Sequence, residues 1–418
     1  MTIEVTDPSS IEPTPSRLFR PLGIFNEWRL QVYGYAVAAI YAAFLVCAYR
    51  SGVWIVNNTG LPVYTDFACA WAATLEALRG TAASLYDPSE FVKVQAALVG
   101  SRDYFYPNWP YPPTFFLILA PFTVLPYNWG FIVWDLATLL SLVIIVYLIL
   151  PRLPAIALVL ASPFTAWNFL AAQNGFLTGS LLGAGLLFLE SRPVLAGVFI
   201  GSLTYKPQFG ILIPLALAAS RQWRAFASAV VTAALLVAVS IAVFGTDVWA
   251  AFPRQLVAQS SVNFFGDPDG DWGYLQTVYG LIRNLHGSAR LAWLAQGLTA
   301  LMSAVIVWIA WRSQTRYALK AATLSAAALI ATPYAFAYDI AAIVVPAAFL
   351  ATDQRRRGLL PGEQTIWIIL FGAPLIVLIT LGDNVGGPTF GGTPISLLTV
   401  IALFCVILRR ARHPTAAA

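Results

Sequence analysis

Phe131–Leu150 reads FIVWDLATLLSLVIIVYLIL, twenty residues that contain a single charged side chain, Asp135. A helix rises about 1.5 Å per residue, so a run of this length crosses a hydrocarbon core of about 30 Å. The apolar residues are continuous and do not alternate with period two, which argues against a strand of a membrane barrel. Similar runs recur with Arg, Trp and Tyr at their flanks: Leu30–Tyr49, Phe226–Phe244, Ala292–Trp311 and Ile366–Leu381. The sequence predicts an all-α, polytopic integral membrane protein.

The composition of the whole chain excludes several other classes of protein. Hydrophobic residues make up 59% of the 418, charged residues 10%, and the mean hydropathy is +0.73. A soluble domain carries about 25% charged residues, so a soluble enzyme is excluded. The basic residues are dispersed over loops and no Gly-rich phosphate loop is present, which argues against nucleic-acid binding and nucleotide-sugar chemistry. Three scattered cysteines and two histidines indicate neither a metal site nor a cofactor.

The placement of positive charge predicts the orientation of the chain. With a cytoplasmic N-terminus, most of the 24 Lys and Arg residues fall on the cytoplasmic side. The clusters are Arg17/Arg20/Arg29, Arg152, Arg192, Arg221/Arg224, Arg312/Arg316/Lys320, Arg355–Arg357 and Arg409/Arg410/Arg412. This pattern predicts two cytoplasmic termini and an even number of crossings, which we count as about twelve. The predicted division is a cytoplasmic tail over 1–29, a transmembrane domain over 30–408 and a second tail over 409–418.

The outer side of this topology carries long loops and short helices. The outer loops, 50–113 and 245–290, exceed the usual length of a connection and indicate functional surface structure. The first is predicted to contain a helix over Ala68–Arg79. Three apolar stretches are too short to span a bilayer: Thr114–Leu125, which we interpret as a half-depth helix, Val194–Thr204 and Phe209–Ala219. Broken helices are tolerated in a membrane where they line a cavity or are buried in protein, so we expect a cavity in the outer half.

Four groups of polar residues lie on the same predicted side of the membrane: Asp66, Gln173-Asn174-Gly175, Lys206, and the segment from Tyr334 to Asp339. An ionisable group in a membrane costs about 2.5–3.5 kcal/mol on insertion scales, so each is a functional candidate. Taken singly, each could instead be an interfacial anchor or a loop cap. Their convergence on one side favours a site. Asp135, alone in its apolar helix, is interpreted as a helix-packing or interfacial residue.

Motifs in the first half of the chain resemble glycosyltransferase family 87. The first set is Asp66-Phe67, Trp71-Ala72-Ala73, Gly80, Leu85-Tyr86-Asp87, Tyr111-Pro112-Pro113, Pro121 and Leu125-Pro126-Tyr127. The second set is Gln173 to Thr178, Arg192-Pro193, Ala196-Gly197 and Leu203 to Gln208. The resemblance extends over about residues 60–225 and returns at Thr332-Pro333-Tyr334 and Tyr338-Asp339. It implies a GT-C-type helical bundle, similar to polyprenol-phosphate-mannose-dependent α-1,2-mannosyltransferases.

The resemblance also implies an activity and a site. The family transfers a sugar, here expected to be mannose, from a polyprenyl-phosphate donor to a hydroxyl of a lipid or glycan acceptor. Asp66 corresponds to its catalytic carboxylate. The residues expected to bind substrate are Lys206, Gln173, Asn174, Tyr205, Tyr111, Tyr334 and Asp339. Asp339 could hold an acceptor hydroxyl or pair with Lys206.

The implied location is a bacterial plasma membrane, with the protein in contact with membrane lipids and the site facing the periplasm or cell exterior. Two other classes stay open from the residues: a transporter or flippase of lipid-linked saccharides, and a non-catalytic protein that binds them. Transporters usually show two repeated halves and polar sites at the midplane, which this sequence does not.

Overall fold

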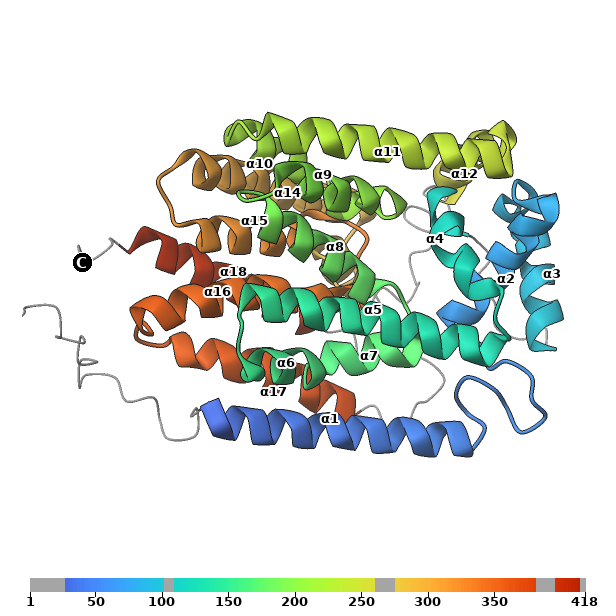
Figure 1. Cartoon of the computed structure of the whole chain (residues 1–418), viewed down its shortest axis with the longest axis horizontal. Coiled ribbons are helices and arrows are strands. Elements are labelled where there is room, and N and C mark those ends of the chain that lie inside the picture. The colour runs from blue at the N-terminus through green and yellow to red at the C-terminus, as the bar shows by residue number, and fades with distance from the viewer. Residues whose placement is uncertain (1–26, 101–108, 260–274, 381–394, 414–418) are drawn as a thin grey trace, which may run out of the picture.

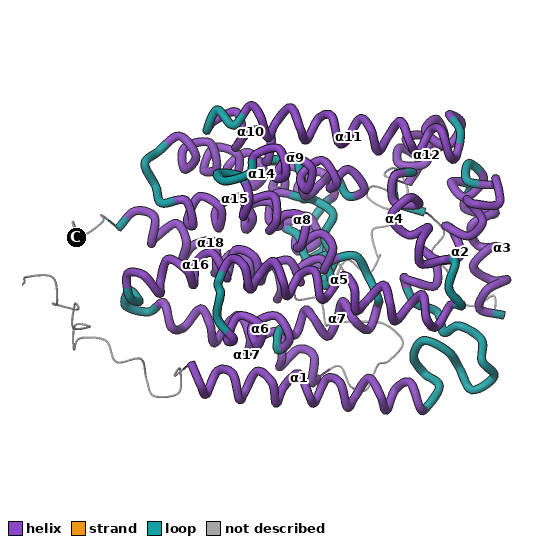
Figure 2. Tube along the Cα trace, in the orientation of Figure 1, coloured by secondary structure: helices purple, strands orange, loops and turns teal. Residues whose placement is uncertain are grey.

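The computed structural model describes residues 27–100, 109–259, 275–380 and 395–413. The described residues form helices joined by loops, with isolated β-bridges and no strand (Figure 2). The helices of the first part are α1 (Glu27–Arg50), α2 (Asp66–Glu76), α3 (Pro88–Val99), α4 (Thr114–Thr123), α5 (Tyr127–Ile149), α6 (Leu153–Leu160), α7 (Pro163–Ala171), α8 (Gly175–Phe188) and α9 (Pro193–Ser202). Those of the second part are α10 (Ile213–Ala219), α11 (Trp223–Phe244), α12 (Thr246–Gln259), α13 (Val278–Asn284), α14 (Ala289–Arg312), α15 (Tyr317–Ala331), α16 (Val344–Arg357), α17 (Glu363–Thr380) and α18 (Ile395–Arg412).

Four of these helices are long and apolar enough to cross a membrane. They cover Trp28–Arg50, Tyr127–Ile149, Trp223–Phe244 and Ala289–Arg312, and the bent pair α6–α7, with 55° between its halves, forms a fifth candidate span. Four of the five predicted apolar runs agree with these helices to within a few residues. The fifth, Ile366–Leu381, falls on α17 apart from Leu381, which lies outside the described residues. The all-helical, multi-pass prediction is therefore supported. The number twelve stays a prediction, because several other apolar helices have only 10 to 17 residues.

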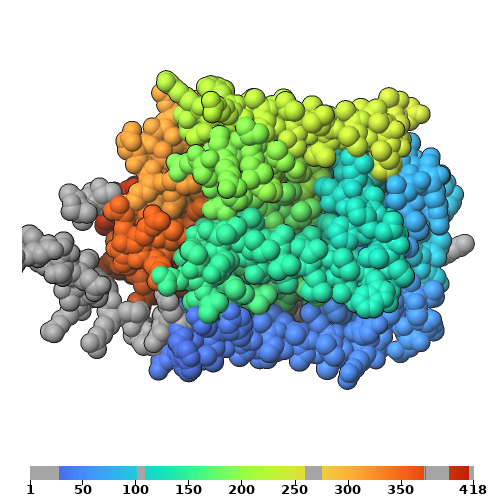
Figure 3. All heavy atoms as spheres, viewed as in Figure 1, coloured from blue at the N-terminus to red at the C-terminus, as the bar shows by residue number. Residues whose placement is uncertain are grey.

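The flanking helices α1 and α11 expose most of their apolar surface. Figure 3 shows them along opposite edges of the molecule. Only 11% of the apolar window of α1 and 6% of that of α11 is buried inside the protein. Their exposed residues include Ile40 and Phe44 on α1 and Val231 and Leu235 on α11. Helices with this much exposed apolar surface require a nonaqueous surrounding, so these two faces contact lipid.

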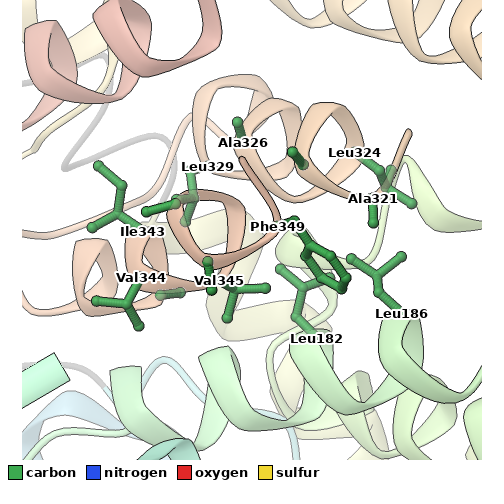
Figure 4. Packing of buried hydrophobic residues seen from close by; sticks show 14 of the residues in the cluster. Leu182, Leu186, Ala321, Leu324, Ala326, Leu329, Ile343, Val344, Val345 and Phe349 are labelled. Atoms are coloured by element: carbon green, nitrogen blue, oxygen red, sulfur yellow. The ribbon is translucent and has the colours of Figure 1, made fainter. Parts of the chain in front are cut away.

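The centre of the bundle is built from α8, α15 and α16. Figure 4 shows Leu182 and Leu186 of α8 against Phe349 of α16, with Leu324 of α15 beside them. Small residues bring the backbones close: a Cβ on Gly179 would lie 3.2 Å from Cα of Ala342. Because lipid is as apolar as these side chains, close packing of this kind holds membrane helices together.

A buried network of ion pairs ties the last four helices together. Arg410 of α18 donates to Asp353 of α16 at 2.5 Å and to Glu363 of α17 at 2.7 Å. Arg316, which precedes α15, binds the other oxygen of Asp353 at 2.6 Å. The start of α1 and the end of α18 lie at this same end of the molecule, on the left in Figure 1.

The opposite end carries α2, α3, α4 and α12 (Figure 1). The predicted helix over Ala68–Arg79 is confirmed as α2 followed by one wider turn, Ala77–Thr81. The short helix predicted at Thr114 is also present, but α4 crosses the direction of α5 in Figure 1 instead of running along it. Of the second long loop, residues 260–274 lie outside the described residues; its described parts form α12 and α13.

The charge pattern predicts which end faces the cell exterior. Cys47 and Cys405 are exposed and would first be replaced by serine. In that background we expect Ser89→Cys, at an exposed position of α3, to react with a membrane-impermeant thiol reagent in intact cells. Arg357→Cys, exposed at the end of α16, should react only after lysis, because the charge pattern predicts that this end of the molecule faces the cytoplasm. Labelling of position 357 in intact cells would show that the predicted orientation is wrong.

Candidate active site

Asp66 is held at the first turn of α2 by a helix cap and an aromatic anchor. The Thr65 hydroxyl accepts a hydrogen bond from the Ala68 amide at 3.2 Å, which closes the helix N-terminus. Phe67 is buried against Phe131 and Trp134 of α5, with ring centroids 5.2 and 6.4 Å away. The half-buried carboxylate of Asp66 therefore lies in the first turn of α2, at the positive end of the helix dipole.

The turn Gln173-Asn174-Gly175 joins α7 to α8 and is fixed by Asn168. Helix α7 ends at Ala171, and the next residue, Ala172, has a φ of 46°, in the left-handed region. The buried amide of Asn168 donates to the Gln173 carbonyl at 3.0 Å and accepts from the Gly175 amide at 2.9 Å. One side chain thus holds the backbone on both sides of Asn174.

Gly175 allows a second segment to approach this turn. A Cβ at this position would lie 2.1 Å from the carbonyl oxygen of Tyr338, closer than real contacts permit. The segment before Asp339 therefore packs directly on the start of α8. This contact explains why a glycine follows Gln173-Asn174.

Lys206 occupies the break between α9 and α10 and is 3% exposed. Its ammonium donates to Oδ1 of Asn174 at 2.6 Å and forms an ion pair with Oδ1 of Asp339. The other carboxylate oxygen of Asp339 accepts from the Phe336 amide at 3.0 Å. The sequence left two roles open for Asp339, and the structure shows the pairing with Lys206.

The segment that carries Asp339 is held from behind by Gln296 of α14. The side-chain amide of this buried residue donates to the carbonyls of Ile330, Ala331 and Thr332 at 3.0–3.2 Å. These are the last carbonyls of α15 and the residue after it, which have no partner within their own helix. Gln296 thus fixes where the loop from Thr332 to Tyr338 begins.

The predicted tyrosines differ in how their hydroxyls are used. Tyr111 donates to Oε1 of Gln173 at 3.1 Å. The Tyr205 hydroxyl lies 2.6 Å from that of Thr178, and its ring stacks on Phe115. The Tyr205 hydroxyl also donates to the Asn174 carbonyl at 3.3 Å, so both tyrosines contact the polar cluster.

The effect of the Asp66 charge on two tyrosines indicates that Asp66 lies near Lys206, Asn174 and Asp339. Burial raises the pKa of Tyr111 well above its ordinary value, and the carboxylates of Asp339 and Asp66 add to the shift. The same three causes raise the pKa of Tyr334. Both phenols therefore stay protonated at neutral pH, and that of Tyr111 donates to Gln173. All eight predicted site residues therefore come from segments that meet at one region of the fold.

Two buried residues of this region were missed in the sequence, Asn168 and Gln296. Each is a polar side chain inside an apolar stretch, and that same signal drew attention to Asp135. Asp135 itself is fully buried in α5, and neither carboxylate oxygen has a hydrogen-bond partner in the described part of the chain. This burial supports the helix-packing interpretation of Asp135.

No group of three or more His, Cys, Asp or Glu side chains that could hold a metal ion occurs among residues 27–100, 109–259, 275–380 and 395–413.

Comparison with known proteins gives one match. The sequence model of glycosyltransferase family 87 matches residues 109–333, more than half of the chain. The matched region contains Tyr111, Gln173, Asn174, Tyr205 and Lys206, whereas Asp66 and Asp339 lie outside it. No curated protein and no solved structure matches the chain.

The pairing of Lys206 with Asp339 predicts a stability effect that depends on both residues. Lys206→Ala should lower the free energy of unfolding by about 3–5 kcal/mol, because it leaves a buried carboxylate without its partner. Lys206→Met combined with Asp339→Asn should restore most of this loss, since neither charge then remains. Thermal unfolding in detergent measures both. Equal destabilisation by the single and the double variant would show that the pair does not act as a unit.

Proposed function

The chain belongs to glycosyltransferase family 87, and from that premise we propose that it transfers a sugar from a polyprenyl-phosphate donor to an acceptor hydroxyl. The sugar we favour is mannose, and the acceptor is a lipid or a glycan. The observation that carries the proposal is the meeting of Asp66, Lys206 and Asp339 at the breaks between short helices.

A lipid-linked donor fits the surroundings of this site. The site lies among apolar helices, several of which are too short to cross a bilayer. A polyprenyl chain can stay in the lipid while its phosphate and sugar reach the breaks between helices. A nucleotide sugar would instead need a water-filled site with a phosphate-binding loop, and the sequence carries no motif for one.

Asp66 is proposed as the catalytic base. The acceptor oxygen attacks C1 of the sugar, the bond from C1 to the phosphate oxygen breaks, and the acceptor proton passes to Asp66. A hydroxyl is a poor nucleophile, so a positioned base accelerates the attack. The lipid phosphate leaves without an acid, so one carboxylate suffices where a glycosidase needs two. A single displacement inverts the anomeric centre.

The other residues are proposed to bind and orient substrate. Because Asp339 already balances the charge of Lys206, we propose that Lys206 acts by fixing Asn174 and Asp339. Tyr111, Tyr334 and Gln173 would then provide hydrogen bonds to sugar or phosphate oxygens. Tyr205 supports the site through Thr178 and Phe115.

The proposed topology has both termini in the cytoplasm, about twelve crossings and the site on the outer face of a bacterial plasma membrane. The basic ends of α16 and α18 and the first residues of α1 support this orientation, because they gather at the end opposite α2 and α3 (Figure 1). The acceptor would then be reached from the periplasm or cell exterior.

Asp66→Asn tests the proposal most simply. Asparagine keeps the size of the side chain but cannot take the proton, so turnover should fall by about 10²–10⁴-fold. The affinity for the donor should be retained, because the base acts mainly in the transition state. Rates with purified protein in detergent, together with donor binding, measure both effects.

Asp87→Asn is the matched control in the same outer loop. The Asp87 carboxylate is exposed and accepts from the Ser89 amide at 2.8 Å and hydroxyl at 2.7 Å, and these bonds lower its pKa. Its role is to cap α3, so this variant should retain most of the parent turnover. Near-parent turnover of a folded Asp66→Asn protein would refute the mechanism. Movement of the lipid-linked sugar across vesicles without transfer would instead favour a flippase.

A further inference from the structure

Tyr338 stands beside the site and is fixed in place on three sides. Its carbonyl oxygen packs against Gly175 at the start of α8. Its ring stacks on Phe336, with centroids 5.3 Å apart and planes 18° from parallel. The ammonium of Lys206 lies 5.3 Å from the centre of the Tyr338 ring. The ring is therefore held by contacts that do not involve its hydroxyl.

The Tyr338 hydroxyl is left unused by the residues that the structure describes. In the described part of the chain this hydroxyl has no hydrogen-bond partner. It is also not one of the fully buried polar atoms that lack a partner, so it is accessible to a ligand. The hydroxyls of Tyr111 and Tyr205, by contrast, are bonded to Gln173 and Thr178. A half-buried, rigidly held hydroxyl without a partner can bind a group of a substrate at little entropic cost.

The charges around Tyr338 indicate what kind of group it can bind. Burial raises its pKa well above the ordinary value, and Tyr111, Asp66 and Asp339 add to the shift. The phenol is therefore held in its protonated form, as a neutral donor. Of the site residues that the structure describes, Asp66 and Asp339 are carboxylates and Lys206 is a cation. Because Lys206 is already paired with Asp339, a phosphate entering the site needs neutral hydrogen-bond donors.

We propose that the Tyr338 hydroxyl donates a hydrogen bond to the leaving phosphate oxygen of the polyprenyl-phosphate donor. The inference rests on the proposed function. As the C1–O bond breaks, its electron pair stays on the phosphate oxygen, and the negative charge there grows. The phenol keeps its own proton and strengthens its hydrogen bond to that oxygen, while the acceptor proton goes to Asp66. A donor aimed at developing charge lowers the barrier.

Tyr338→Phe removes this one hydroxyl and keeps the ring. Turnover in sugar transfer should fall by roughly 10²-fold, the scale for loss of one donor to a developing negative charge. Hydrolysis of the donor by water should fall by the same factor, because it breaks the same bond. The KM for the acceptor and the midpoint of thermal unfolding should not change, because no hydrogen bond within the protein is lost.

Tyr317→Phe is the control, for which we expect a change in thermal stability and no change in turnover. The Tyr317 hydroxyl is half-buried near the start of α15 and donates to the Leu186 carbonyl. Its loss should lower the thermal midpoint and leave turnover unchanged. A Tyr338→Phe protein that behaves like this control would show a structural role and overturn the proposal.

Two other results would also overturn it. If Tyr338→Phe slows transfer and raises the acceptor KM while hydrolysis continues at the parent rate, the hydroxyl contacts the acceptor. If neither reaction changes, the hydroxyl contacts no reacting group. Failure of the proposed function is seen separately, because the unaltered protein would then neither transfer nor hydrolyse a polyprenyl-phosphate sugar.

Discussion

The contact of Lys206 with Asp339 and Asn174 joins three places where the chain breaks its helices. Lys206 separates α9 from α10, Asn174 separates α7 from α8, and Asp339 follows α15. These residues are far apart in sequence, and each break alone would leave polar groups in an apolar surrounding. A buried ion pair repays its desolvation cost only when its geometry is good and its remaining lone pairs are bonded. The second oxygen of Asp339 meets this condition by accepting from Phe336.

The breaks in the helices are tolerated because side chains form hydrogen bonds with the backbone groups that the breaks leave unpaired. A broken helix in a membrane leaves amides and carbonyls that water cannot reach. At the end of α7, the indoles of Trp54 and Trp134 donate to the Leu170 and Ala172 carbonyls at 3.1 and 3.0 Å. Asn168 and Gln296 serve the neighbouring turns. The polar region is therefore a supported structure, in which the cluster can be held rigidly enough for chemistry.

The long helices could be predicted from the sequence because hydropathy alone determines them. The run Phe131–Leu150 became α5, and Ala292–Trp311 became α14 with three further residues at its start and one at its end. The segments that converge on the site were also predictable. Each carries a polar residue in an apolar stretch, and burying such a residue in a membrane costs free energy, which marks it as a functional candidate. The pairing of Lys206 with Asp339, 133 residues away, was one of two roles that the sequence left open for Asp339, because no local pattern encodes which partner a buried carboxylate takes. Gln296 was missed because a single amide in an apolar helix carries no sign of the carbonyls that it will meet. Twelve crossings cannot be counted from length, because short helices such as α9 and α10 end at breaks.

The proposed mechanism predicts the anomeric configuration of the product. In the proposed mechanism, a single base, Asp66, and a leaving group that departs from the opposite side of the sugar give one displacement at C1. The anomeric configuration of the product shows this directly, by NMR of the glycan made by purified protein from a β-linked polyprenyl-phosphate sugar. The account predicts an α-linkage in the product. A β-linked product would require two displacements, and with them a covalent intermediate, and would contradict the role given to Asp66.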